Sequence, residues 1–301
     1  MKVIVTGVGG QLGYDVMNEL AKRGYECVGS DILAQENIVL PFAYTQLDIT
    51  DKNAVERFVF VEKPDVVIHC AAWTAVDAAE EERNQAKVYK INADGTRYIA
   101  EACKKIDCKM VYISTDYVFN GEGNEPWHPD CKEYAPLNVY GMSKLRGELA
   151  VAETLRKYFI VRIAWVFGQN GNNFVKTMLN LGKKYDTLRV VNDQIGTPTY
   201  SYDLARLLVD MVETDKYGYY HATNEGNYIS WYDFACEIFK QAGYNTNVIP
   251  VTTEEYGISK AKRPLNSRLY KNKLVEAGFA LLPDWKDALK RFLSKKEHLN
   301  V

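Results

Sequence analysis

The residues best placed for acid–base chemistry are Tyr140 and Lys144, in the segment NVYGMSK. On a helix, positions i and i+4 share one face, so both side chains can meet a single bound cofactor. A tyrosine with a pKa of about 10 is a weak acid–base group at neutral pH. A lysine ammonium about 4 Å away contributes about 4 kcal/mol at an effective dielectric constant near 20, or about three pKa units. We therefore expect Lys144 to bring the phenol of Tyr140 into its working range, with an exposed helix pair as the alternative interpretation.

Two adjacent hydroxyl groups precede this pair, in the segment STDY at residues 114–117, where a strand is expected to end. The hydroxyl of Thr115 can donate a hydrogen bond to a substrate carbonyl oxygen while Tyr140 delivers the proton. Ser114 is the competing candidate, and we expect only one of the two to face the site because side chains alternate along a strand. A hydroxyl that caps the strand end is the alternative interpretation for both.

A glycine-rich turn follows the first apolar run, in the segment TGVGGQLG. Gly7 permits the tight turn, Gly10 lets the backbone approach a pyrophosphate, and Gly13 lets helix and strand pack closely. The amides of Gln11 and Leu12 then point at the phosphate from the N-terminus of the helix. Glycine spacing alone also fits an ordinary turn, but its place between a strand and a helix favours dinucleotide binding.

A carboxylate follows the second expected strand at Asp31, 18 residues after Gly13. At this position it can bind the hydroxyls of the adenosine ribose. The same carboxylate would repel a 2′-phosphate, and no Arg or Lys lies between Asp31 and Leu40 to offset that repulsion. The sequence therefore favours NADH over NADPH, with a solvated loop acid as the alternative interpretation of Asp31.

Short apolar runs alternate with longer amphipathic stretches through the first half of the chain. Near-continuous apolar strands separated by helices indicate a parallel sheet that is covered on both faces. We therefore expect an α/β fold with a doubly wound, Rossmann-type parallel sheet that binds ligands at the carboxyl ends of its strands. The predicted strands are Lys2–Thr6, Glu26–Gly29, Asp65–Cys70, Lys109–Ser114 and Phe159–Ala164.

The second half of the chain predicts a smaller, substrate-binding lobe. We expect residues 1–168 to form the dinucleotide-binding domain, with residues 201–222 returning to it, and residues 169–200 and 223–301 to form the lobe. The helices predicted in this half are Phe174–Leu181, Ser201–Val212, one that opens on the capping box at Ser230 and runs to Gln241, and Trp285–Leu293.

Composition excludes several classes of protein. The net charge of −2 over 301 residues gives no reason to expect a nucleic-acid partner. The six cysteines form no C-x-x-C pair, and the four histidines share no helical or turn spacing, so neither a disulfide framework nor a histidine-based metal site is expected. We expect no signal peptide, because Met1 and Lys2 lead directly into an apolar strand, and no apolar run reaches the ~18 residues that a membrane span needs. We expect a cytoplasmic protein with no membrane partner.

Together these segments resemble the dTDP-4-dehydrorhamnose reductases, a family within the extended short-chain dehydrogenase superfamily. These dehydrogenases use the G-x-x-G-x-x-G spacing found here. STDYVF, AAWTAVD and DQIGTPT in combination indicate the reductase family itself. The resemblance runs nearly end to end through further segments, among them QLDITD, YKINADGT, PLNVYGMSKLRGE, VRIAWVFG, NNFVKTM, YYHATNEG, SWYDFACEI and AKRPLNSRL.

The resemblance implies an activity, namely reduction of the 4-keto group of dTDP-4-dehydro-L-rhamnose to dTDP-L-rhamnose by NAD(P)H. Tyr140 would donate the proton, Lys144 would hold the nicotinamide ribose, and Thr115 would tune the tyrosine and bind the keto oxygen. Residues implied to contact the cofactor are Asp48 and Ile49 beside the adenine, and Ala71, Ala72 and Trp73 along its path across the sheet. Residues implied to contact the sugar nucleotide are Val76, Thr115, Asp116, Trp165 and Arg263.

Several alternatives stay open at this point. Trp165 also fits a core tryptophan, and Arg263 a solvated basic turn. A nucleotide-sugar 4-epimerase needs only the tyrosine–lysine pair, whereas a 4,6-dehydratase needs an acid where Tyr117 stands. A non-catalytic, dinucleotide-binding regulatory subunit is the alternative from another class. Some relatives dimerise through a metal held by acidic side chains, which leaves a homodimer open; only Asp15 aligns with them, and we assign no metal to this chain.

Overall fold

The centre of the molecule is a seven-stranded parallel sheet in the order β11-β6-β5-β4-β1-β2-β3. The computed structural model describes residues 1–37 and 42–295. From the central β1 the chain adds β2 and β3 on one side and then β4, β5 and β6 on the other, which confirms the doubly wound, Rossmann-type sheet. The strands are β1 (Lys2–Thr6), β2 (Glu26–Asp31), β3 (Ala43–Gln46), β4 (Val66–His69), β5 (Lys109–Thr115), β6 (Tyr158–Ile163) and β11 (Gly218–His221).

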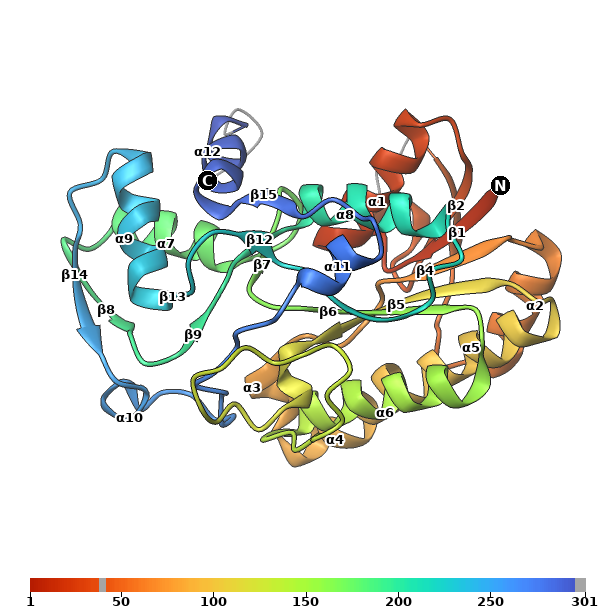
Figure 1. Ribbon diagram of the computed structural model, residues 1–301, viewed down its shortest axis with the longest axis horizontal. Coiled ribbons are helices and arrows are strands. Elements are labelled where there is room, and N and C mark those ends of the chain that lie inside the picture. Colours follow the sequence, from red (N-terminus) through yellow and green to blue (C-terminus); the bar gives the residue numbers. More distant parts are fainter. Residues whose placement is uncertain (38–41, 296–301) are drawn as a thin grey trace.

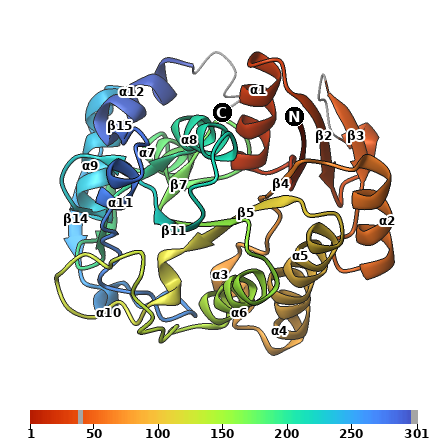
Figure 2. The same ribbon diagram turned by 45° about the vertical axis from the view of Figure 1, so that its right-hand side comes forward.

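Helices cover both faces of this sheet (Figures 1 and 2). One face carries α1 (Gln11–Lys22) and α8 (Ser201–Val212), and the other carries α2 (Lys52–Glu62), α5 (Thr96–Lys105) and α6 (Val139–Thr154). Successive side chains of each strand therefore point alternately into the apolar cores on the two faces of the sheet. In β5, Val111 and Ile113 belong to the core under α1 and α8, whereas Met110 and Tyr112 belong to the core under α2 and α5.

A second group of elements lies beside the sheet, at the left of Figure 1. It consists of α7 (Phe174–Gly182), α9 (Trp231–Ala242), α12 (Trp285–Ser294) and the parallel pair β8 (Thr187–Val191) and β14 (Asn247–Val251). Its own apolar core includes Phe234, Ile238, Leu289 and Phe292. The predicted capping box at Ser230 is present and opens α9. The domain limits drawn from the sequence stay a prediction.

Short elements complete the described part of the chain. Among residues 1–37 and 42–295, none of the helices combines the length and apolarity that crossing a bilayer requires. The short elements are η1 (Gln35–Asn37), α3 (Val76–Ala79), α4 (Glu82–Tyr89), the π-helix η2 (Lys90–Gly95), η3 (Asp116–Val118), β7 (Val166–Phe167), β9 (Ile195–Gly196), β10 (Thr199–Tyr200), β12 (Asn224–Glu225), β13 (Ile229–Ser230), α10 (Thr253–Tyr256), α11 (Asn272–Glu276) and β15 (Leu282–Asp284).

Candidate active site

A cavity of about 750 Å³ lies at the carboxyl ends of β1, β4, β5 and β6. Successive connections leave β1 and β4 in opposite directions, and this reversal opens the crevice in which α/β sheets bind ligands. Most of the residues singled out from the sequence line this one cavity. They are Gly7, Gly10, Gln11, Leu12, Gly13, Asp31, Asp48, Ile49, Ala71, Ala72, Val76, Thr115, Asp116, Tyr140, Lys144 and Trp165.

Two of the expected site residues, Trp73 and Arg263, lie outside the lining of this cavity. The indole of Trp73 donates a hydrogen bond to the carbonyl oxygen of Ala75 at 3.0 Å. Arg263 donates to both carboxylate oxygens of Asp77, at 3.1 and 2.8 Å, and lines a neighbouring cavity of about 330 Å³. The two cavities adjoin, because Phe174 and Trp231 line both.

The glycine loop has the close packing that its sequence predicts. Gly7 has a φ of +73° and its N–H donates to the carbonyl oxygen of Ser30 at 2.7 Å. A Cβ on Gly13 would lie 2.2 Å from the Gly7 carbonyl oxygen, whereas one on Gly10 would meet only that oxygen, at 3.2 Å. Gly10 is also the N-cap of α1 and gives it no side-chain cap. The open face of Gly10 and the uncapped amides of α1 fit a dinucleotide pyrophosphate.

Asp31, the last residue of β2, contacts the glycine loop. Its carboxylate accepts hydrogen bonds from the backbone N–H of Gly9 at 2.9 Å and of Leu33 at 3.3 Å. Ile32 and Leu33 are exposed beside it and line the cavity, as do Asp48 and Ile49. A carboxylate fixed by backbone donors next to exposed apolar side chains is an arrangement that suits an adenosine moiety.

Tyr140 and Lys144 lie in the first turns of α6, which opens on the Asn138 side chain as N-cap. The Lys144 ammonium lies 4.1 Å from the centroid of the Tyr112 ring, and the residue is 3% exposed. Burial lowers the pKa of Lys144 to about 7. Cation and ring attract each other in such an arrangement, so Tyr112 offsets part of the cost of burying the ammonium.

The pKa of Tyr140 differs from the expectation. Burial raises it above its usual value of 10, the negative charge of Asp116 raises it further, and a hydrogen bond with Thr115 lowers it. The expected lowering by Lys144 is wrong for the described chain, because that ammonium packs on Tyr112. Tyr140 is therefore a protonated phenol at neutral pH, which is the form that a proton donor requires.

Both hydroxyl groups at the end of β5 line the cavity, so the expectation that only one would face it is wrong. Thr115 is still extended and paired with Ile163, so alternation holds to the end of β5. The cavity instead extends around the carboxyl end of the strand, and residues from both of its faces line it. The Thr115 hydroxyl donates to Asp116 Oδ1 at 2.9 Å and accepts from the Tyr117 N–H at 3.2 Å. Ser114 is 2% exposed, and its hydroxyl has no hydrogen-bond partner in the described structure.

Asp116 is a buried carboxyl group beside these residues. Burial raises its pKa to about 6, and hydrogen bonds from Ser267 and Thr115 oppose that rise. Its Oδ2 atom has no hydrogen-bond partner among the described residues. The residue lines the cavity, where its negative charge also raises the pKa of Tyr140.

Trp165 forms the wall on the side of the second group of elements. Its φ of +52° lies in the left-handed region that side-chain-bearing residues rarely adopt. The ring stacks on Trp231 with the centroids 3.8 Å apart and the planes 16° apart. Trp165 thus faces the cavity rather than a closed core, and Trp231 is a lining residue that the sequence did not predict.

Other supporting residues were also not predicted. Asn92, in the π-helix η2, accepts from the backbone N–H of Trp73 at 2.8 Å and donates to its carbonyl oxygen at 3.1 Å, which fixes the loop after β4. Asn170 donates to the carbonyl oxygen of Gly9 at 2.8 Å, and Asn173 donates to Gln11 at 3.0 Å. The segments YKINADGT and QNGNN contain these residues, but a polar loop alone does not indicate which loop it touches.

The fold and the site together define a class of protein. A Rossmann sheet with a glycine loop after β1, and a tyrosine–lysine pair that meets the same cavity, are the features of a nicotinamide-dependent short-chain dehydrogenase of the extended type. The comparisons with known proteins agree. The family model described as the RmlD substrate binding domain matches residues 1–298.

Known relatives identify the family more closely. The chain is 41% identical to a dTDP-4-dehydrorhamnose reductase of Aggregatibacter actinomycetemcomitans, over 98% of this chain and 99% of the relative. It is 39% identical to the spore coat polysaccharide biosynthesis protein SpsK of Bacillus subtilis, over 98% of each. The crystal structure of a Bacillus anthracis dTDP-4-dehydrorhamnose reductase in complex with NADP matches with a TM-score of 0.89 and 42% identity, over 98% of this chain and 99% of that one.

The chain therefore belongs to the dTDP-4-dehydrorhamnose reductase family, which confirms the resemblance seen in its sequence. It is an oxidoreductase that uses a nicotinamide dinucleotide.

Proposed function

We propose that this chain reduces the 4-keto group of dTDP-4-dehydro-L-rhamnose to dTDP-L-rhamnose, with Tyr140 as the proton donor. The proposal rests chiefly on one observation: Tyr140, Lys144 and Thr115 line the same cavity as the glycine loop. The names of the relatives support this substrate, and the protonated phenol of Tyr140 supports the direction of reduction.

In this proposal some residues of the chain bind the cofactor and others act on the keto oxygen of the substrate. Gly7, Gly10 and the amides that open α1 would hold the pyrophosphate, and Lys144 would hold the nicotinamide ribose. When bound, the nicotinamide supplies a hydride. Tyr140 donates its proton to the keto oxygen, and the hydrogen bond with Thr115 stabilises the phenolate that remains.

We propose NADH as the preferred cofactor. The Asp31 carboxylate accepts from the Gly9 N–H and lines the cavity, where it would bind the hydroxyls of an adenosine ribose and repel a 2′-phosphate. The kcat/KM for NADH should be compared with that for NADPH, because the crystal structure of the relative from Bacillus anthracis contains NADP. A kcat/KM for NADPH equal to or above that for NADH would contradict this preference.

We assign the sugar nucleotide to the side of the cavity formed by Val76, Asp116 and Trp165. Its diphosphate would extend toward the neighbouring cavity that Arg263 lines. Arg263 is ion-paired with Asp77, so a diphosphate would have to share its guanidinium with that carboxylate. Val76, Asp116 and Trp165 belong to residues 1–168, but the neighbouring cavity is lined, apart from Asp77, by residues of 169–200 and 223–301, which supports the predicted role of these segments as the substrate-binding lobe. The six cysteines are all free, which supports the expected cytoplasmic location.

The test is oxidation of NADH and NADPH by the purified protein in the presence of dTDP-4-dehydrorhamnose, followed by absorbance. The proposal predicts turnover with freely exchanging cofactor and formation of dTDP-rhamnose. Purification with a tightly retained NAD, together with interconversion of nucleotide-sugar 4-epimers and no net cofactor oxidation, would contradict it and indicate an epimerase.

A further inference from the structure

We infer that the side-chain amide of Asn138 positions the proton donor, because it connects the start of α6 to the segment 260–263, which carries Arg263. This inference rests on the proposed function and adds to it a residue that lines neither of the two cavities described above. Asn138 is therefore a positioning residue rather than a catalytic one, and it acts through Tyr140.

The amide of Asn138 makes one hydrogen bond with each of its two ends. Asn138 is the N-cap of α6 and is buried, and its Oδ1 atom accepts from the backbone N–H of Gly141 at 2.8 Å. Asn, Asp and Ser cap helices about equally well, so the helix alone does not require an amide here. The Nδ2 atom donates to the carbonyl oxygen of Lys262 at 2.8 Å. An ionised Asp has no proton for that second bond.

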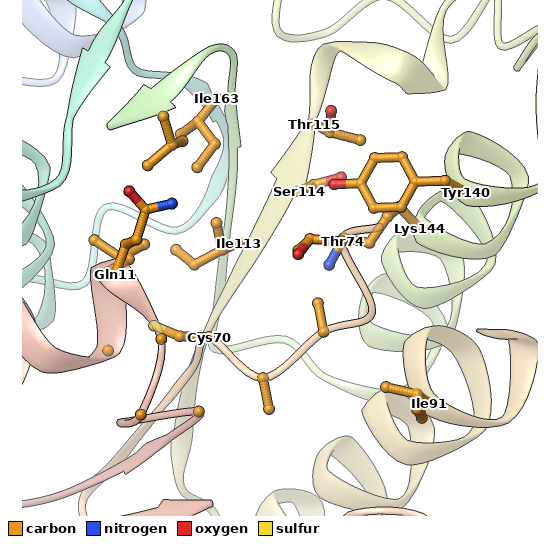
Figure 3. Close-up of a pocket in the computed structure, with 18 of the residues that line it drawn as sticks. Gln11, Cys70, Thr74, Ile91, Ile113, Ser114, Thr115, Tyr140, Lys144 and Ile163 are labelled. Atoms are coloured by element: carbon orange, nitrogen blue, oxygen red, sulfur yellow. The ribbon is translucent and has the colours of Figure 1, made fainter. Parts of the chain in front are cut away.

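The first turn of α6 is also held on other sides. Glu80 Oε1 accepts from the backbone N–H of Val139 at 2.8 Å. A Cβ on Gly141 would lie 2.3 Å from the carbonyl oxygen of Tyr117, so the helix packs directly on η3 at this point. Tyr140 lies between these contacts, and its ring extends from α6 into the cavity (Figure 3). The contacts of this one turn therefore set the position of the phenol.

The other residues of the segment 260–263 bind carboxylates of α3 and of the turn between α3 and α4. The pairs are Lys260 with Glu81 at 3.0 Å, the Ala261 N–H with Asp77 at 3.0 Å, and Arg263 with Asp77 at 2.8 Å. These carboxylates belong to residues 1–168, whereas the segment belongs to the predicted substrate-binding lobe. Of these contacts between the two parts, the bond from Asn138 is the one that reaches the helix of the proton donor.

This connection matters because both of its ends act on one substrate molecule. In the proposed function Arg263 binds the diphosphate, and Tyr140 protonates the keto oxygen of the sugar. Arg263 directly follows Lys262, so the bond from Asn138 fixes the one group relative to the other. A misplacement of about 1 Å between a substrate and a reacting group can cost about 100-fold in rate. We therefore expect Asn138 to affect the chemical step more than the binding of either ligand.

The variant that separates the two bonds is Asn138→Ser. Its hydroxyl keeps the cap on α6, but the side chain is too short to reach the Lys262 carbonyl oxygen as well. The preformed complex with NADH is mixed with saturating dTDP-4-dehydrorhamnose, and the first turnover is followed by absorbance. We expect its rate constant to fall by ~10- to 100-fold with the amplitude of the wild type. The Kd values of NADH and dTDP should stay within about threefold.

Hydrogen exchange in the unliganded protein gives a measurement that does not depend on activity. The Ala261 N–H donates to Asp77, so this amide should exchange faster in Asn138→Ser if the segment 260–263 is loosened. The amides of α6 should keep their protection, because the cap remains. Asn138→Asp should give the same pattern, since a carboxylate also caps the helix and lacks the donor.

Asp284→Ala is the matched control. The Asp284 side chain caps α12 by accepting from the Lys286 N–H at 2.8 Å, and α12 contributes none of the lining residues described for either cavity. Loss of this cap should lower the melting temperature and leave the rate constant of the first turnover unchanged. A fall in that rate constant for Asn138→Ser then reports the lost connection rather than a general loss of stability.

Three results would overturn the inference, each in a different way. Wild-type protein that leaves the ketone unreduced refutes the proposed function, and the role of Asn138 in it. An active wild type with an Asn138→Ser rate constant within about threefold of it refutes the role of Asn138 alone. An Asn138→Ser protein whose amplitude falls while its rate constant holds would show that Asn138 only stabilises the fold.

Discussion

The buried ammonium of Lys144 gives the most quantitative prediction. The residue is 3% exposed, and burial lowers its pKa from 10.5 to about 7. The folded-state pKa lies below the unfolded-state value, so charging this group destabilises the folded protein. That penalty is fully present below pH 7 and disappears above pH 10.5, so stability associated with Lys144 rises as the pH rises.

The magnitude follows from the two pKa values. Each pKa unit corresponds to about 1.4 kcal/mol, so the penalty is about 5 kcal/mol at pH 6 and about 2 kcal/mol at pH 9. Lys144→Met keeps the length of the side chain and removes the charge. Any change in packing is common to both pH values. The stabilisation by Lys144→Met should therefore be about 3 kcal/mol larger at pH 6 than at pH 9.

Urea unfolding of wild type and variant at the two pH values measures this difference directly. Lys104→Met is the control, because Lys104 is exposed on α5 and its ammonium is hydrated whether the chain is folded or not. A stabilisation by Lys144→Met that is equal at pH 6 and pH 9 would refute the reasoning. It would mean that the ammonium is solvated in the folded protein.

Two further predictions concern Asp116 and the glycine loop. Burial raises the pKa of Asp116 from 3.8 to about 6, so the stability contributed by its protonated form is lost as the pH rises through that range. Asp116→Asn should therefore stabilise the protein by up to about 3 kcal/mol at pH 8 and not at pH 4. Thermal unfolding that shows equal gains in stability at both pH values would contradict this. Gly13→Ala would place a Cβ 2.2 Å from the Gly7 carbonyl oxygen and should destabilise the unliganded protein, as measured by calorimetry. Gly10→Ala should leave the stability within about 1 kcal/mol and weaken NADH binding at least ~10-fold, as measured by fluorescence titration. A Gly10→Ala protein that binds NADH as tightly as the wild type would indicate that the loop is an ordinary turn.

The central strands were predictable because each is a nearly continuous apolar run. β1 matches the predicted limits of Lys2–Thr6, and α8 matches Ser201–Val212. The edge strands β3 and β11 were not predicted. Ala43–Gln46 contains no buried residue, and Gly218–His221 is four residues long, so neither has the apolar pattern of a strand that is covered on both faces.

The lining of the cavity was predictable where a residue follows a strand. Gly7 and Ala71 follow β1 and β4, Thr115 ends β5, and parallel strands bring their carboxyl ends to one edge of the sheet. Trp73 shows the limit of that reasoning, because the backbone after β4 turns its indole toward the Ala75 carbonyl. Arg263 shows another limit, since its partner Asp77 lies far away in the sequence.

The charges were the least predictable part of the site. The spacing of Tyr140 and Lys144 fixes a shared helix face but not the direction of a flexible lysine side chain. Tyr112, on the neighbouring strand, competes for the ammonium and lies 4.1 Å from it. Burial then dominates both pKa values, and burial depends on the whole fold rather than on a local pattern.

The most direct test of the central claim is the rate of NADH oxidation by Tyr140→Phe with dTDP-4-dehydrorhamnose. If the phenol of Tyr140 supplies the proton, kcat should fall by at least ~100-fold while NADH binds as tightly as it does to the wild type. A Tyr140→Phe protein that reduces the ketone at the wild-type rate would contradict the account, because the proton would then come from another group.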